Sequence, residues 1–163
     1  MAEVIALRAP WTSDVLLATP TAPHPAGFDR LPSEWSVIDA VVIGGVVVDH
    51  VVVGPNGLFT VNVDPDPRPA SIGPDGIYRE GCRVTTTVKD ALMAASRLRS
   101  ELGGPVFAYP ILVSTLHADR HQLDRLGVVP GDRIAEYIWS HPGLPMRRSQ
   151  RLEVQWALRR PLR

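Results

Sequence analysis

The sequence contains very little cysteine and lysine, and it has no long apolar run. Cys82 is the only cysteine among the 163 residues, which excludes a disulfide framework and a cysteine metal cluster. Lys89 is the only lysine, so lysine-dependent chemistry has a single candidate. No stretch of about 18 apolar residues is present, so no membrane span is predicted. The 17 basic and 17 acidic residues cancel, which argues against a broad nucleic-acid footprint and leaves room only for a local basic patch.

The overall composition of the chain is typical of a globular protein. Hydrophobic residues make up 45% of the chain and charged residues 21%. The length favours one domain, and no basic region precedes the apolar residues 4–7, so we expect no secretory signal and a cytoplasmic location. Closely spaced prolines predict an irregular arm over residues 1–33, in which residues 15–18 form a short strand or a helical turn. The single domain is then expected over residues 34–163.

Two valine-rich segments around a tight turn form the central pattern of the chain. Residues 46–53 and 58–63 favour strands, and Gly54-Pro55-Asn56-Gly57 lies between them. Asn-Gly is typical of hairpins because both residues tolerate a positive φ. Residues 34–43 are also rich in β-formers and reach the first segment through Gly44-Gly45. Three strands joined by short turns predict an antiparallel meander.

The second half of the chain mixes helical and strand patterns. Residues 77–81 favour a short strand or ribbon, and apolar spacings of three and four predict a helix over residues 85–102, with a threonine cap. The apolar run 106–113 suits a strand buried on both faces. The remaining expectations are a short helix or loop over residues 118–126, a helix over residues 134–139 with Asp132 as its cap, and a last helix over residues 150–159. This order predicts an α/β fold with one mixed sheet flanked by helices.

Residues 48–59 carry a specific motif, in which Asp49 and His50 precede three valines, Gly54-Pro55 and then Gly57-Leu58-Phe59. This motif resembles the nuclease-related domain family (NERD), which belongs to the restriction-endonuclease-like group with PD-(D/E)XK active sites. Residues 78–81, the helix after them and the strand 106–113 are similar to the order of elements in that family. The resemblance covers about residues 34–140 and implies a restriction-endonuclease-like sheet, an antiparallel meander plus a buried strand, with Mg²⁺-dependent phosphodiester cleavage in active members.

The catalytic motif is altered in this chain. Mg²⁺ is held by carboxylates and water, and a lysine stabilises the charge that develops on the phosphoryl group. Asp49 matches the first acid, but Asn62 stands where the second acid is expected and Asp64 where the lysine is expected. The resemblance therefore implies a degenerate site without a cofactor. The alternative is an active nuclease in which Asp49 and Asp64, with Asp66 as a further candidate, hold Mg²⁺ and Lys89 supplies the cation.

A basic cluster near the C-terminus offers a binding surface. It consists of Arg147, Arg148, Arg151, Arg159, Arg160 and Arg163, with Trp139 and Trp156 nearby in the sequence. Arginines with aromatic residues can bind phosphates and stack on bases. We therefore expect a binding or accessory component, with DNA or RNA as one class of partner. Other protein subunits are the alternative, in which case the chain is a structural part of an assembly.

The histidines give a weaker signal. His50 is expected on the face opposite to Asp49, because side chains alternate along a strand, as a packed or edge histidine rather than a ligand. His117 and His121 are four residues apart, a spacing with which a helix can bind zinc, but the sequence shows no third ligand for them.

Overall fold

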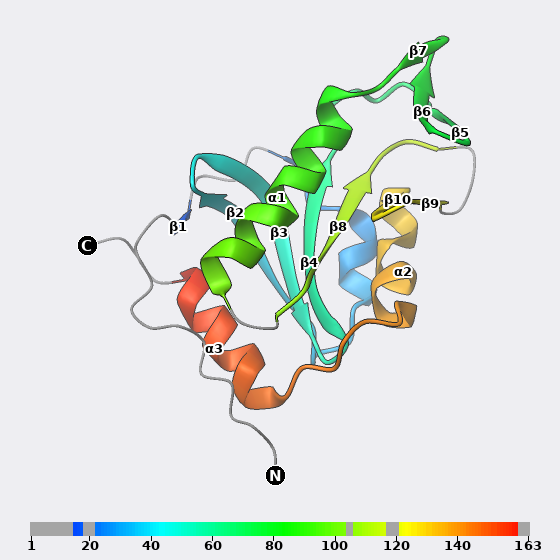
Figure 1. The fold of residues 1–163 in the computed structure, drawn as a ribbon. Coiled ribbons are helices and arrows are strands. Elements are labelled where there is room, and N and C mark those ends of the chain that lie inside the picture. The colour runs from blue at the N-terminus through cyan, green and yellow to red at the C-terminus, as the bar shows by residue number, and fades with distance from the viewer. Residues whose placement is uncertain (1–14, 18–21, 104–105, 117–120, 160–163) are drawn as a thin grey trace.

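A seven-stranded mixed sheet lies at the centre of the structure, a computed structural model that describes residues 15–17, 22–103, 106–116 and 121–159 (Figure 1). The strand order is β1-β2-β3-β4-β8-β10-β9. The strands are β1 (Val15–Leu17), β2 (Ser36–Ile43), β3 (Val46–Gly54), β4 (Gly57–Val63), β8 (Ala108–Val113), β9 (His121–Leu123) and β10 (Leu126–Val129). Strands β1 to β4 are antiparallel, β8 runs parallel to both β4 and β10, and β9 returns antiparallel on β10.

The predicted antiparallel meander is confirmed by β2, β3 and β4. The β3–β4 turn is tighter than the four-residue signal suggested, because Gly54 pairs with Gly57. Only Gly57 of this turn has a positive φ, at 137°. Asn56 acts instead through its side chain, whose amide donates to the carbonyl oxygens of Ile138 at 2.6 Å and His141 at 3.1 Å. The turn is thereby fixed to the helix that packs behind it.

Helices cover both faces of the sheet, as the pattern predicted (Figure 1). Helices α1 (Thr86–Leu102) and α3 (Arg148–Arg159) share one core with β2 and β3, to which Leu98, Leu102 and Leu158 contribute. The 3-10 helix η1 (Ala26–Arg30) and α2 (Ile134–Ser140) form the second core, around Phe28 and Phe59. Strand β8 is buried, as its apolar run predicted. Among the described residues, no helix has the length and apolar character needed to cross a bilayer.

The segment expected as a short helix or loop over residues 118–126 was predicted wrongly where the structure describes it. Residues 121–129 form the β9–β10 hairpin, and β10 extends the sheet beside β8. Gly127 lies directly under the ring of Tyr137, where a Cβ atom would come within 2.2 Å of the hydroxyl oxygen. Residues 118–120 fall outside the described part. The pairing that creates β10 is with a distant strand, so local sequence gave no sign of it.

Two further expectations need correction. Asp132 does not cap α2, because it lies inside a short 3-10 helix, η2 (Gly131–Arg133), and α2 begins after Arg133 without a side-chain cap. Thr85 precedes α1 but also makes no side-chain capping bond. The strand that was one of two expectations for residues 15–18 is confirmed by β1, which pairs with β2, and η1 adds a helical turn that packs in the second core.

A separate three-stranded ribbon projects from one end of the sheet (Figure 1). It consists of β5 (Ser71–Gly73), β6 (Gly76–Arg79) and β7 (Cys82–Arg83), all antiparallel. The prediction of a strand or ribbon at residues 77–81 is therefore confirmed, and Cys82 is exposed at its edge.

Ala40 interrupts the β2–β3 ladder with a left-handed backbone conformation, at φ 54°. The strands keep one register on both sides of this point, but the pair that would join Ala40 to Asp49 is missing. Ile38 and Val41, which lie on either side of Ala40, both belong to the core beneath α1 and α3. The kink therefore changes which positions of β2 face the core. Even-numbered Ile38 faces it before the kink, and odd-numbered Val41 and Ile43 face the same core after it.

We expect Ala40→Val to lower the free energy of unfolding by about 2–3 kcal/mol, because a β-branched side chain strongly disfavours a positive φ and the site is buried. Urea denaturation would measure the change. Ala40→Gly is the control, since glycine adopts this conformation freely, and it should stay within about 1 kcal/mol of the parent. Equal stability of the valine variant and the parent would contradict the left-handed kink.

Candidate functional site

Asp49 and Asn62 lie together where β3 and β4 separate. The ladder between these strands ends at the pair of His50 and Val61. Beyond it, the Asp49 carboxylate accepts the backbone N–H of Val63 at 2.8 Å, and the Asn62 amide donates to the carbonyl oxygen of Val47 at 3.2 Å. The two side chains thus replace backbone bonds that the diverging strands no longer make.

A cleft of about 570 Å³ opens beside Asp49 and Asn62, against the first turns of α1. The helix contributes Thr86, Thr87 and Asp90 to its lining. Asp49 and Asp90 are the charged groups of this lining, and both are acidic. Among the residues that the structure describes, no lysine, arginine or histidine lines the cleft. Phosphoryl transfer needs positive charge where the phosphoryl oxygens lie, and the described lining residues of this cleft carry none.

Asp64 lies in a different environment, buried in an ion pair. Its side chain is only 2% exposed and meets the guanidinium of Arg79, itself 7% exposed, at 2.6 Å. The same carboxylate accepts the hydroxyl of Ser114 at 3.1 Å and the backbone N–H of Asp66 at 3.1 Å. With these partners, Asp64 neutralises Arg79 and closes a turn.

The ion pair continues outward into a small network of charges. Arg79 also approaches Asp66 at 3.5 Å, and Arg68 bridges Asp66 at 2.6 Å and Glu80 at 2.7 Å. Hydrogen bonds from the side chain and backbone of Arg68 hold the pKa of Asp66 well below its usual range. The network joins the end of β4 to the ribbon, and so Asp64 and Asp66 both serve to attach the ribbon.

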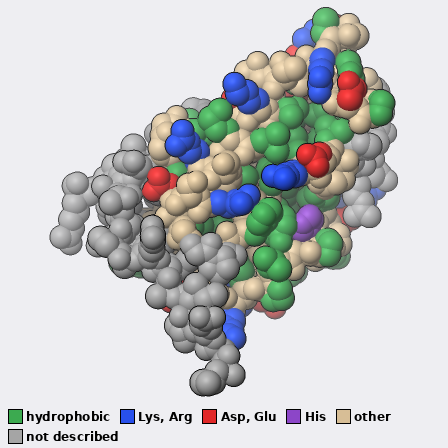
Figure 2. All heavy atoms as spheres, viewed as in Figure 1, with side chains coloured by type: hydrophobic (Ala, Val, Ile, Leu, Met, Phe, Trp, Pro, Cys, Tyr) green, Lys and Arg blue, Asp and Glu red, His purple; other side chains and the backbone are tan. Residues whose placement is uncertain are grey.

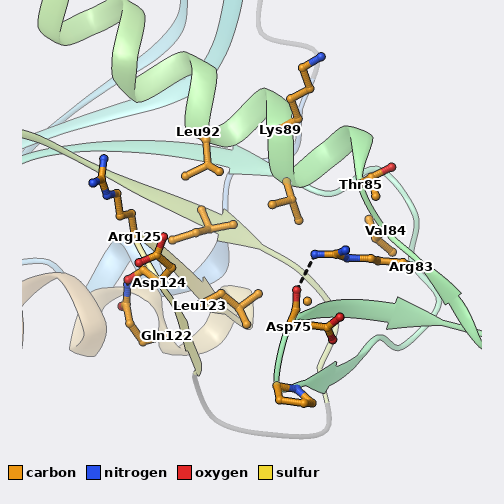
Figure 3. A pocket seen from close by; sticks show the side chains of 14 residues that line it. Asp75, Arg83, Val84, Thr85, Lys89, Leu92, Gln122, Leu123, Asp124 and Arg125 are labelled. Carbon is orange, nitrogen blue, oxygen red and sulfur yellow. Dashed lines mark hydrogen bonds between the residues drawn. The ribbon is translucent and has the colours of Figure 1, made fainter.

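Lys89 lines a second cleft, of about 590 Å³, between the ribbon, α1 and the β9–β10 hairpin (Figure 3). Figure 3 shows its side chain extending away from Arg83 and Leu123. Neither Asp49 nor Asp64 lines this cleft. Of the four predicted catalytic positions, the structure brings together Asp49 and Asn62 and places Asp64 and Lys89 in separate surroundings.

The predicted basic cluster divides into two parts on α3. Arg147 and Arg148 are exposed at the start of the helix, and Arg159 is exposed at its end. Arg151 is half-buried and donates to the carbonyl oxygen of Glu34 at 3.1 Å, so it contributes to docking the helix. Arg160 and Arg163 lie outside the described residues. On the face viewed in Figure 2, basic side chains are dispersed rather than gathered in one block.

Exposed apolar side chains accompany the arginines. Leu152 and Trp156 are 55% and 59% exposed on α3, one turn apart. Leu144 and Trp139 are 57% and 50% exposed in the segment before it. Large exposed apolar side chains that cluster are typical of interaction surfaces.

A group that sequence reasoning missed lies on the other face of the sheet. His50 is buried, as predicted, and its Nδ1 lies 2.7 Å from the carboxylate of Asp39. His24 approaches the same carboxylate at 3.8 Å. Asp39 and His50 could have been paired by aligning the strands about Gly44-Gly45, but no local signal brings in His24. His117 and the side chain of His121 fall outside the described part, and His121 begins a strand rather than a helix.

Comparison of the chain with protein-family models, with curated proteins and with solved structures finds no match.

We expect Arg79→Leu to lower the free energy of unfolding by about 3–5 kcal/mol, because it leaves the buried Asp64 carboxylate without its counter-charge. Chemical denaturation would measure the loss. Arg68→Leu is the matched control, since its side chain is 55% exposed, and it should cost much less. If both variants lost the same free energy of unfolding, the ion pair with Asp64 would contribute no more to stability than the exposed contacts of Arg68.

Proposed function

We propose that this chain is a restriction-endonuclease-like domain related to the NERD family that has lost catalysis and acts as a binding component. The observation that carries the proposal is the environment of Asp64. Asp64, the residue at the position of the expected lysine, is an acid. Its carboxylate forms a buried ion pair with the guanidinium of Arg79, at 2.6 Å. A residue committed to holding the ribbon in this way is a poor candidate for a metal ligand.

The cleft beside Asp49 supports the same proposal. Catalysis by a metal ion requires at least one or two free carboxylates facing an open site. One oxygen of the Asp49 carboxylate accepts the Val63 N–H, and Asn62, which stands where the second acid is expected, adds no charge. Lys89 does not line the cleft beside Asp49. The alternative, an active Mg²⁺-dependent nuclease with Asp49, Asp64 and Lys89, would require the Asp64–Arg79 pair to open.

The start of α3 favours an anionic partner such as DNA or RNA. Arg147 and Arg148 stand at the positive end of the helix dipole, where basic side chains are unfavourable by a few tenths of a kcal/mol or more. A bound phosphate there would remove that penalty and would also gain charge-assisted hydrogen bonds. Trp156 lies two turns further on the same helix and is exposed, which suits stacking on a base.

The second candidate is a structural role in a protein assembly. The exposed side chains of Leu144, Leu152 and Trp139 favour it, because nucleic acid offers few partners for aliphatic surface. A protein interface would use these residues and leave the arginines at its rim.

We expect purified protein to leave linear duplex DNA, single-stranded DNA and RNA intact in Mg²⁺ or Mn²⁺. Gel assays with Asp49→Ala in parallel would measure this, and both proteins should show the same background. Cleavage by the parent that disappears in Asp49→Ala would overturn the proposal in favour of the active nuclease.

We expect salt-sensitive binding of single-stranded DNA or RNA that weakens in the double variant Arg147→Gln with Arg148→Gln. Each lost phosphate contact should reduce the slope of the logarithm of the binding constant against the logarithm of the salt concentration by about 1. Fluorescence anisotropy at several salt concentrations would measure the slope. Arg125→Gln, an exposed arginine on the β9–β10 turn, is the matched control and should leave the slope unchanged.

Absence of binding at low salt, or equal binding by the double variant, would remove the nucleic-acid role of α3. If Leu152→Ser then abolishes assembly with a co-purified subunit, the structural role is the correct one.

A further inference from the structure

His24, Asp39 and His50 converge beside η1, on the face of the sheet opposite to the cleft that Asp49 lines. Each offers a nitrogen or carboxylate oxygen, and these atoms lie within 4.8 Å of one another. They come from three separate segments: His24 precedes η1, Asp39 belongs to β2 and His50 to β3. Among the described residues, this is the group of three metal-ligating side chains that the fold assembles.

The distances lie close to those of a metal site. Zinc bound to nitrogen and oxygen ligands in a tetrahedron holds neighbouring ligand atoms about 3.3 Å apart. The Asp39 carboxylate is 2.7 Å from Nδ1 of His50 and 3.8 Å from Nε2 of His24. A bound ion would have to open the first separation and close the second, and all three ligand atoms already lie within 4.8 Å of one another.

The second nitrogen of His50 is also arranged as in metal-bound histidines. Its Nε2 lies 3.4 Å from the carbonyl oxygen of Pro23. Metal-bound histidines usually donate their remaining N–H to a carbonyl or carboxylate, which fixes the tautomer and leaves the other nitrogen for the metal. In a metal-bound state of this group, the Pro23 carbonyl would accept the Nε2–H of His50 and Nδ1 would be left for the metal.

An aromatic side chain holds the two imidazoles in place. The ring of Phe28 contacts His24 edge to face at 4.9 Å between centroids and His50 at 5.3 Å. The centroids of the two imidazole rings lie 5.4 Å apart. Phe28 is buried, so His24 is ordered by packing even though its own side chain is 47% exposed.

We propose that His24, Asp39 and His50 form a binding site for a divalent transition-metal ion, with zinc as the best match. Imidazole and carboxylate are ligands that zinc prefers, and magnesium and calcium take oxygen ligands instead. Asp39 and His24 face solvent while His50 closes the inner side, so a water molecule can complete the coordination. A hydrogen bond between Asp39 and His50 alone would account for that pair but gives no reason for His24 to face the same oxygen.

Isothermal titration calorimetry, in which Zn²⁺ is added to the chelator-treated full chain, tests the proposal. We expect one ion per chain, and a rise in melting temperature on zinc addition because the ion binds the folded state. Co²⁺ in place of Zn²⁺ should give the visible absorption of a four-coordinate site. His24→Gln and Asp39→Asn should each weaken zinc binding at least tenfold. Both positions are partly exposed, so the variants should stay folded, which circular dichroism would check.

The double variant His117→Gln with His121→Gln is the matched control, because it removes the other histidine pair at a metal-binding spacing in the sequence. It should bind zinc like the parent. The proposal is overturned if the folded parent binds no zinc at millimolar concentration, or if His24→Gln and Asp39→Asn bind as tightly as the parent. Loss of binding only in the control would place the ion at His117 and His121 instead.

Discussion

The ion pair between Asp64 and Arg79 is the interaction on which the arrangement at the end of the sheet depends. Both side chains are almost fully buried, so each charge would be costly without the other. Asp64 follows β4 directly, and its backbone N–H also bonds to the carbonyl oxygen of Val113 at the end of β8. Arg79 ends β6. One contact therefore joins the two central strands to the ribbon.

Polar residues also complete the hydrogen bonding beside the central hairpin. The turn between Gly54 and Gly57 sets the register of β3 and β4 and so brings Asp49 and Asn62 together at the edge where their ladder ends. At that edge, Asp49 and Asn62 complete the hydrogen bonding of two separating strands, and Asp64 compensates a buried cation. Asp64 is paired by Arg79 and Ser114, whereas the buried Oδ1 of Asn62 has no hydrogen-bond partner among the described residues.

The sequence predicted the elements whose signals are local. The valine-rich segments, the Gly-Pro-Asn-Gly turn and the spacing of apolar residues from 84 to 102 were sufficient for the meander and α1. Strand β10 was missed because only four residues make it and its pairing with β8 is parallel, so no short turn between the two strands signals it. The environment of Asp64 could not be predicted either, since a proline-rich Asp-Pro-Asp-Pro segment indicates a turn and says nothing of Arg79. Contacts between distant segments decide the site, and one sequence does not specify them.

The kink at Ala40 places two kinds of polar group on opposite faces of the same strand pair. Asp39 and His50 are paired across β2 and β3 on one side of the interruption, and Asp49 stands at the position that Ala40 leaves unpaired. His50 packs on Phe28 in the core beneath η1 and α2, whereas Asp49 lines the cleft beside α1. Strained backbone of this kind persists only where the surrounding structure determines it. Here the covering helices do so, because Ile38 and Val41 must both reach the core of α1 and α3. Adjacent residues of β3 therefore meet separate chemical environments, so the cleft beside Asp49 and the group around His50 lie on different faces of the sheet.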